Sequence, residues 1–153
     1  MLEAQQSKRM RQHLNIHQNY EDACQRLLNA VGTDSYIRPH RHSLDPKTET
    51  LFAIRGRFAL VLFEDRGVPH KIVLFGSGEL NRSDNVGVEL QPGSWHTVLA
   101  LTEGAILLEV KAGPFKADAA KELAPWAPEE GSESAEEYLS RLRTHALEVG
   151  SAL

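Results

Sequence analysis

The chain has 153 residues, of which 41% are hydrophobic and 25% are charged, and its formal net charge is −4. This length fits one domain of about 100 to 200 residues, and the composition is that of a globular protein rather than of a disordered chain or one that coats a nucleic acid. A single cysteine, Cys24, excludes an internal disulfide and a multi-cysteine metal site. Any metal must therefore be held by nitrogen and oxygen atoms.

The N-terminal stretch MLEAQQSKRMRQHLNIHQ contains basic residues but lacks the apolar core of a signal peptide. Elsewhere no apolar run approaches the roughly 20 residues that a membrane span requires. We therefore expect a cytoplasmic protein whose partner is a small molecule, with neither a membrane nor a nucleic acid as partner.

Residues 19–31 show apolar side chains at the three- and four-residue spacing of a helix, with Asn19 as a cap and Gly32 as an end. The apolar set is Tyr20, Ala23, Cys24, Leu27, Leu28 and Val31. This pattern predicts a helix that buries Cys24 as a small hydrophobe. We divide the chain into an N-terminal arm and helix (1–32), a β-barrel (33–113) and a C-terminal connector and helix (114–153), all within one structural domain.

Residues 36–112 contain short β-like runs separated by turn signals. The runs are IRPHRH, TLFAIRG, RFALVLFE, KIVLF, VGVEL, HTVLAL and AILLEVKA, and the turns include EDRG, GSGELNRSDN, QPGS and TEG. Many short strands at this spacing predict an antiparallel barrel or sandwich.

A second helix is predicted after the connector, capped by Ser132 or Ser134 and started by acidic residues. Its apolar stripe consists of Ala135, Tyr138, Leu139, Leu142 and Ala146. We expect this stripe to pack on the barrel or on a second subunit.

Two histidines two residues apart, His40 and His42, point to one face if their segment is extended, because side chains alternate along a strand. Glu49, at the start of the next strand, could complete a set of three ligands. The turn Pro92-Gly93 delivers a fourth candidate, His96, at the start of another strand.

The pattern His40-x-His42, Glu49 and then Gly56, followed by Pro92-Gly93-x-x-His96, resembles the two sequence motifs of the cupin superfamily. That resemblance implies three histidines and one glutamate, His40, His42, His96 and Glu49, on a metal ion inside a small barrel. From about residue 11 to about residue 130 the chain is also similar to WbuC-type cupin-fold metalloproteins, which are often associated with bacterial O-antigen gene clusters.

The resemblance implies an all-β cupin jelly-roll (double-stranded β-helix) barrel with flanking N- and C-terminal α-helices, assembled as a homodimer. It also implies a metal-dependent enzyme, isomerase- or epimerase-like or dioxygenase-like, acting on a small carbohydrate-related or carboxylated substrate, with a place in surface-polysaccharide biosynthesis. Two alternatives stay open: a non-catalytic module that binds a small molecule, and a structural cupin whose metal only stiffens the barrel.

The chain departs from the general cupin pattern in three places. Six residues, rather than three or four, separate His42 from Glu49, Pro92 stands directly before Gly93 in the second motif, and Ala100 stands where many cupins carry Asn. Imidazoles and one carboxylate suit divalent Fe, Mn, Ni, Co or Zn, and the order of affinities does not choose among them.

Four further residues are candidates for contact with a substrate. Tyr36 and Arg38 share the predicted face of the histidines and are expected to bind substrate, Tyr36 also as a catalytic group, although a structural salt bridge is an alternative for Arg38. Glu109 and Lys111 share one face of their strand. We expect this face to be the barrel interior, where both would be acid or base catalysts; on the outer face they would be a solvated pair.

Three other residues are expected to have no part in the chemistry. Trp95 lies on the opposite face from His96 and is predicted to pack. His13 and His17 are spaced as a helical metal pair would be, but their polar surroundings favour an exposed or subunit-contacting arm.

Overall fold

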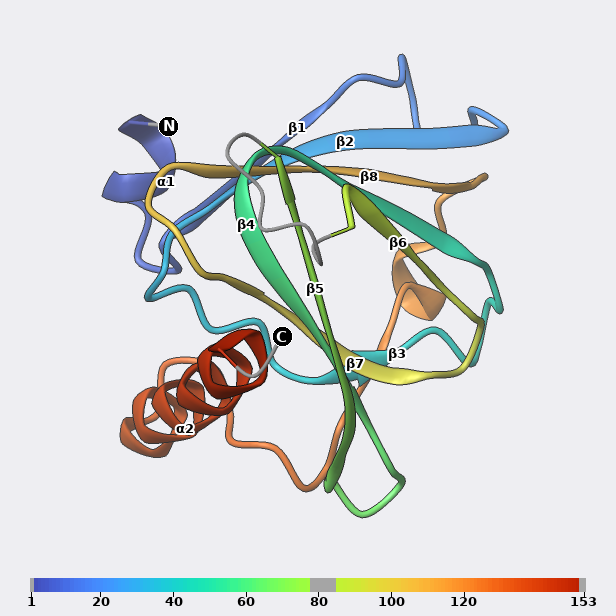
Figure 1. Ribbon diagram of the computed structural model, residues 1–153. Coiled ribbons are helices and arrows are strands. Elements are labelled where there is room, and N and C mark those ends of the chain that lie inside the picture. The colour runs from blue at the N-terminus through green and yellow to red at the C-terminus, as the bar shows by residue number, and fades with distance from the viewer. Residues whose placement is uncertain (1, 78–84, 152–153) are drawn as a thin grey trace.

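The computed structural model describes residues 2–77 and 85–151. Within these residues the chain forms one curled sheet of nine strands with a helix near each end (Figure 1). The strands are β1 (Arg11–Asn15), β2 (Cys24–Val31), β3 (His40–Arg41), β4 (Glu49–Phe63), β5 (Pro69–Ser77), β6 (Gly87–Leu90), β7 (Trp95–Ala100), β8 (Ala105–Ala112) and β9 (Glu122–Leu123). The helices are α1 (Leu2–Gln6), a short 3-10 helix (Ala117–Ala119) and α2 (Glu133–Ser151).

Strand β4 belongs to both layers of the barrel. Its first half pairs with β6 and β8, and its second half pairs with β5 and β7. Between the halves Gly56 has φ = 80°, and a Cβ added there would lie 2.5 Å from Thr102 Oγ1. Glycine therefore allows the strand to bend, so that β1, β2 and β8 face β3 and β7 across the barrel (Figure 1).

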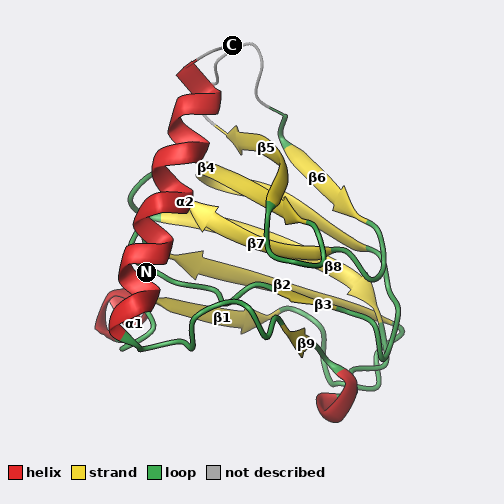
Figure 2. Ribbon diagram, turned by 90° about the horizontal axis from the view of Figure 1, so that it is seen from below, coloured by secondary structure: helices red, strands yellow, loops and turns green. Residues whose placement is uncertain are grey.

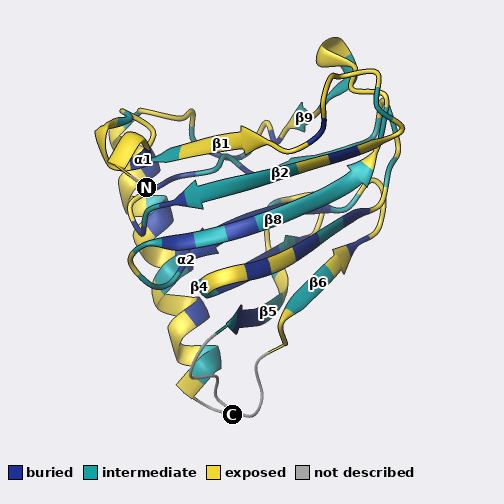
Figure 3. Ribbon diagram, turned by 90° about the horizontal axis from the view of Figure 1, so that it is seen from above, coloured by how far each residue is buried: buried dark blue, intermediate teal, exposed yellow. Residues whose placement is uncertain are grey.

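The predicted strands are found, with some changes in extent. TLFAIRG and RFALVLFE are two parts of the single strand β4, whereas IRPHRH contributes only the short β3. Buried and more exposed residues alternate along the first half of β4 (Figure 3), as expected for a strand with one face inside a barrel. Most of the predicted turn at residues 76–85 lies outside the described residues.

The space between the two layers is apolar at one end of the barrel. Phe58 and Phe75 are fully buried there, with stacked rings whose centroids lie 5.4 Å apart. Around them pack apolar residues of both layers: Val31, Leu51, Ala53, Leu60, Leu90, Val98, Ala100, Ala105 and Leu107. The other end of the interior holds polar side chains and is described below.

Helix α2 packs against the sheet, as the stripe predicted (Figure 2). Four residues of the stripe are buried, namely Ala135, Leu139, Leu142 and Ala146. Tyr138 is partly buried against the same cluster. Their partners include Val61, Phe63, Leu74 and Leu99. No helix in the described part of the chain combines the length and apolar character needed to cross a membrane.

The helix predicted over residues 19–31 is wrong. Residues 24–31 form β2, which is hydrogen-bonded to β1 on one side and to β8 on the other, so the barrel sheet begins before residue 33. The inward-facing residues of β2 are Gln25, Leu27, Asn29 and Val31. Because two of these four are polar, the two-residue alternation of a strand was hidden, and the apolar residues matched a helical period.

Cys24, predicted to be buried, is exposed. It is the first residue of β2, and the alternation of the strand directs Gln25 inward and Cys24 outward. The helix near the N-terminus is instead α1, which is five residues long.

Candidate metal centre

Three histidines meet at the polar end of the barrel. In the sheet His40 of β3 is paired with His96 of β7, and His42 follows β3 directly. The ring centroids lie 4.5 Å apart for His40 and His96, 5.4 Å for His40 and His42, and 5.7 Å for His42 and His96. One nitrogen from each ring lies within 4.8 Å of the other two. Nitrogens bound about 2.1 Å from one ion lie at most about 4.2 Å apart, so only a small closing of the rings is required.

The orientation of each ring is set by a hydrogen bond from Nδ1 to a backbone carbonyl. The carbonyls belong to Arg38 for His40 (3.0 Å), Ala120 for His42 (2.5 Å) and Ser94 for His96 (2.9 Å). With Nδ1 donating, the Nε2 atom of each ring is the one available as a metal ligand. Metal-binding histidines usually show this arrangement, in which the second ring nitrogen donates to a carbonyl or carboxylate. The donor set therefore fits a divalent transition metal.

Glu49 lies beside the histidines and is 5% exposed. Its Oε2 atom is 3.0 Å from Nε2 of His42 and 3.6 Å from Nε2 of His96. Burial alone would raise the pKa of Glu49, but the hydrogen bond with His42 and the charge of Lys111 hold it well below its usual value. The longer loop at residues 43–48 therefore does not carry this carboxylate away from the histidines.

Protonation of the histidines divides them into two kinds. Burial lowers the pKa of His40 and of His96, so both are neutral and able to bind a metal. Burial also acts to lower the pKa of His42, but the hydrogen bond and charge of Glu49 outweigh it and raise that pKa. In the metal-free chain the protonated form of His42 is therefore stabilised. Its positive charge lies at the position where a bound metal ion would supply one.

Lys111 and Glu109 point into the barrel, as expected for this face of their strand. Lys111 Nζ donates to Glu49 Oε1 at 3.0 Å and to Glu109 Oε1 at 2.5 Å, and Asn29 Nδ2 donates to Glu109 Oε2 at 3.1 Å. Burial and the nearby charge of Glu49 raise the pKa of Glu109 to about 7. One ammonium thus serves two carboxylates, and a polar chain runs from Asn29 to the histidines.

The structure does not bring the side chains of Tyr36 and Arg38 to the histidines. Tyr36 is buried on the side of the sheet covered by α2, where its hydroxyl donates to the Pro128 carbonyl at 3.0 Å and its ring meets Tyr138. Arg38 donates to the Ala124 carbonyl at 2.9 Å. The shared face was inferred from an extended segment, but β3 begins only at residue 40, so the alternation does not extend back to these two residues.

A cavity of about 410 Å³ opens beside the histidines. It is lined by the four candidate ligands and by Glu109 and Lys111. It is also lined by residues that the sequence analysis did not select, among them His17, Gln25, Asn29 and Lys121. His17 was predicted to lie on an exposed or subunit-contacting arm, but in the structure it is 6% exposed and lines this cavity, with Nδ1 held at the backbone of Arg26. One signal in the sequence could have indicated this side of the cavity. It is the pair of polar residues in β2 that point inward, in a strand that pairs with the strand carrying Glu109.

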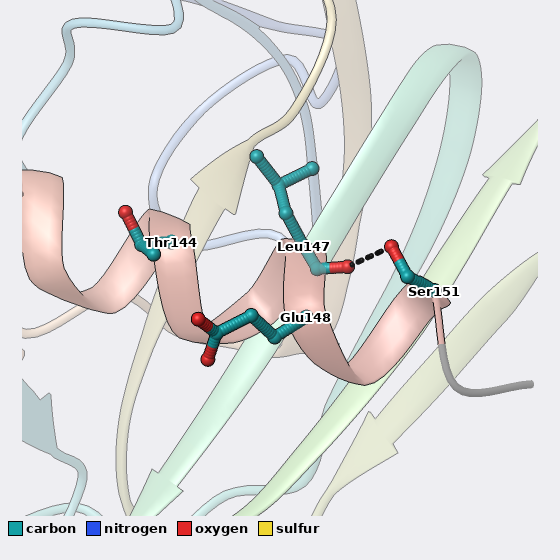
Figure 4. Close-up of a pocket in the computed structure, with 4 residues that line it drawn as sticks. All are labelled: Thr144, Leu147, Glu148 and Ser151. Carbon is teal, nitrogen blue, oxygen red and sulfur yellow. Dashed lines mark hydrogen bonds between the residues drawn. The ribbon is translucent and has the colours of Figure 1, made fainter.

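Two other features lie outside this cavity. Trp95 is 6% exposed and packs in the cluster under α2, with the guanidinium of Arg41 4.3 Å from its ring centroid, so its predicted packing role agrees with the structure. A hollow on α2 is lined by Thr144, Leu147, Glu148 and Ser151, and the Ser151 hydroxyl donates to the Leu147 carbonyl (Figure 4). It contains none of the predicted site residues.

Comparison with known proteins identifies the fold. The chain is similar in structure to protein SO0799 from Shewanella oneidensis, with 10% identity, a TM-score of 0.59 and coverage of 88% of this chain and 83% of that one. It is also similar to a Klebsiella pneumoniae protein with a double-stranded β-helix domain, with 13% identity, a TM-score of 0.52 and coverage of 74% and 84%. The chain has a cupin fold.

A third similar structure is oxalate decarboxylase from Bacillus subtilis, with 17% identity and a TM-score of 0.54; the match covers 74% of this chain and 27% of that one. At these identities the likeness concerns the cupin fold alone. Residues 1–74 match the family model DUF6016, described as a domain of unknown function. A search of curated protein sequences finds no match.

The lowered pKa of His40 predicts how the stability of the metal-free chain depends on pH. Burial, with the charges of His96 and Lys121, keeps that pKa well below 6.5. Below about pH 6.5 the unfolded chain therefore binds a proton that the native chain does not, and the free energy of unfolding falls as the pH falls. Urea unfolding in the presence of a chelator measures this effect. Below pH 6 the free energy of unfolding of the unsubstituted protein should fall by up to about 1.4 kcal/mol more per pH unit than that of His40→Asn. Parallel pH profiles would mean that His40 is protonated in the native state.

Proposed function

We propose that this cupin is a metal-dependent enzyme whose divalent ion is held by His40, His42, Glu49 and His96. The observation that carries the proposal is the common orientation of the three rings, each with Nδ1 on a backbone carbonyl and Nε2 available. Glu49 adds a buried negative charge within hydrogen-bond distance of one ring. Fe, Mn, Ni, Co and Zn all suit this donor set.

The residues around the ion would bind substrate and move protons. When bound, the metal would supply a Lewis acid or a centre that binds oxygen. Lys111 can orient an anionic group, and Glu109, with a pKa raised to about 7, can accept or donate a proton near neutral pH. The cavity of about 410 Å³ is of a size that takes a small molecule.

The substrate class follows from the sequence resemblance and the cavity together. We propose a small carbohydrate-related or carboxylated substrate, and the similarity to WbuC-type proteins supports a place in surface-polysaccharide biosynthesis. Oxalate decarboxylase, one of the similar structures, is named for a carboxylated compound. The cytoplasmic location, the single structural domain and the homodimeric assembly stay predictions from the sequence.

The test is elemental analysis of the protein purified without added metal or chelator, beside His40→Ala and a control, His70→Ala, whose histidine is exposed on β5. We expect about one metal ion per chain in the native protein and in the control, and less than about a tenth of that in His40→Ala. Iron, manganese or nickel would direct a search for turnover to sugar nucleotides and small acids.

Other outcomes favour the alternatives. Zinc alone, in a site closed to further ligands, would support a structural metal. Full metal content in His40→Ala would contradict the ligand assignment. No metal in the native protein, and none taken up on titration, would favour a metal-free module that binds a small molecule.

A further inference from the structure

The charge of the cavity differs in sign from the charge of the whole chain. The chain has a formal net charge of −4, yet four cationic side chains and only two carboxylates line the cavity: Arg9, Arg11, Lys111 and Lys121 against Glu49 and Glu109. Two of the cations, Arg9 and Arg11, are paired with Glu130, and Lys111 is paired with both lining carboxylates. A metal ion would make the cavity more positive still.

Lys121 is the lining cation whose side chain makes no hydrogen bond or direct ion pair within residues 2–77 and 85–151, although the charge of Glu130 is near enough to act on it. It follows Ala120, whose carbonyl orients His42. The residue is exposed. Partial desolvation of its ammonium and the positive charges of Arg11 and Arg9 lower its pKa, and the charge of Glu130 acts to raise it. An anion beside Lys121 would pair the ammonium and offset the neighbouring positive charges.

A second donor comes from the opposite edge of the sheet, where the chain passes from β1 to β2. The backbone N–H of Arg26 donates to Nδ1 of His17 at 3.0 Å, while the Arg26 carbonyl already accepts from the N–H of Ile16 at 2.8 Å. Nδ1 also lies 2.9 Å from the Arg26 carbonyl, but that oxygen has two lone pairs and already accepts from the N–H groups of both Ile16 and His17. We therefore assign Nδ1 as the acceptor for the Arg26 N–H, which places the ring proton on Nε2. This Nε2 atom is buried with no hydrogen-bond partner in the described chain, and His17 lines the cavity. A buried N–H without a partner is costly unless a ligand accepts from it.

We propose that the cavity binds the oxyanion of a small molecule, a carboxylate or a phosphate, which is recognised by Lys121 and by the Nε2–H of His17. The inference deepens the proposed function and rests on it for the view that this cavity receives the substrate. Binding of the anion does not itself require the metal, because both donors belong to the protein and neither is a candidate ligand of the ion. The two claims can therefore fail separately.

The test is calorimetric titration of the chelator-treated, dialysed protein at low ionic strength with malonate, with inorganic phosphate and with glycerol as a neutral probe. Lys121→Gln removes the unpaired charge, and Lys116→Gln is the matched control, since Lys116 lies in the same connector but does not line this cavity. His17→Asn keeps an acceptor for the Arg26 N–H but lacks the Nε2–H. Thermal unfolding confirms that each variant is folded.

We expect at least one of the two anions to bind the native protein and Lys116→Gln equally, and glycerol not to bind. Lys121→Gln should weaken that binding about tenfold and His17→Asn about fivefold. Tighter binding of malonate would indicate a carboxylate ligand, and tighter binding of phosphate a phosphorylated one. Should His17→Asn fail to fold, the comparison of Lys121→Gln with Lys116→Gln decides.

The proposal is overturned if neither anion binds, if glycerol binds as well as they do, or if Lys121→Gln behaves like Lys116→Gln. It is also overturned in its present form if a folded His17→Asn binds the anion as tightly as the native protein. Anion binding by a protein that takes up no metal would refute the metal-dependent function and leave this inference standing. If the protein takes up metal but neither the metal-free nor the metal-loaded form binds an anion, this inference is refuted and the metal-dependent function stands.

Discussion

Lys111→Met should lower the free energy of unfolding of the metal-free chain by roughly 3 kcal/mol at pH 8. Lys111 lies between Glu49 and Glu109, whose side chains are 6% and 15% exposed, and it donates to both. Methionine keeps much of the packing volume but leaves two carboxylates next to each other without their cation. The loss should be smaller at pH 5, because Glu109, with a pKa raised to about 7, takes up a proton there and the repulsion disappears.

Urea unfolding at the two pH values measures this effect, with Lys71→Met as the control because Lys71 is exposed on β5. The control should change stability by no more than about 0.5 kcal/mol. Adding a divalent metal should restore part of the stability lost in Lys111→Met, since an ion bound by Glu49 supplies positive charge at the same place. Equal losses in the two lysine variants would show that Lys111 is not needed to neutralise the carboxylates.

Glu49→Gln should weaken the binding of a divalent metal by at least about 100-fold, whereas Glu109→Gln should weaken it by less than about tenfold. Of the carboxylates in residues 2–77 and 85–151, only that of Glu49 has an oxygen near two of the histidine Nε2 atoms, at 3.0 and 3.6 Å. Glu109 instead binds Lys111 and Asn29. A carboxamide is a poor ligand for these metals, so the charge and the coordinating oxygen are lost together in Glu49→Gln.

The two glutamine variants form a matched pair, because each removes one buried carboxylate that contacts Lys111. Thermal unfolding checks that each variant is folded, and the difference in metal affinity between two folded variants then reports ligation. Competition for cobalt or manganese against a coloured chelator measures that affinity. Equal losses, or a greater loss in Glu109→Gln, would remove Glu49 from the set of ligands.

The parts of the fold that the sequence predicted are those in which short-range pattern and tertiary environment agree. Alternation along the first half of β4, and the turn between β6 and β7, were visible because each inward face is mostly apolar and each turn carries Gly or Pro. The stripe of α2 was visible because that helix buries one face only. In β2 the inward residues Gln25 and Asn29 are polar, so the pattern was misleading.

The site was predictable where its residues belong to one compact motif. His40 and His42 are two residues apart, and Glu49 and His96 each lie within the first two residues of a recognisable strand. Local spacing and the family resemblance therefore selected all four. Tyr36 was misplaced because two residues of separation imply a shared face only within a continuous strand, and the strand starts at residue 40.

The sequence by itself determined which residue types are available for a metal and on which short strands they lie, because period and turn chemistry are local properties of a chain. Only the tertiary structure decided which side chains meet. The curling of the sheet at Gly56 brings β2 and β8 over β3 and β7. Residues as distant as His17 and Lys121 therefore line one cavity with the four candidate ligands, and no pattern within a window of the sequence contains that information.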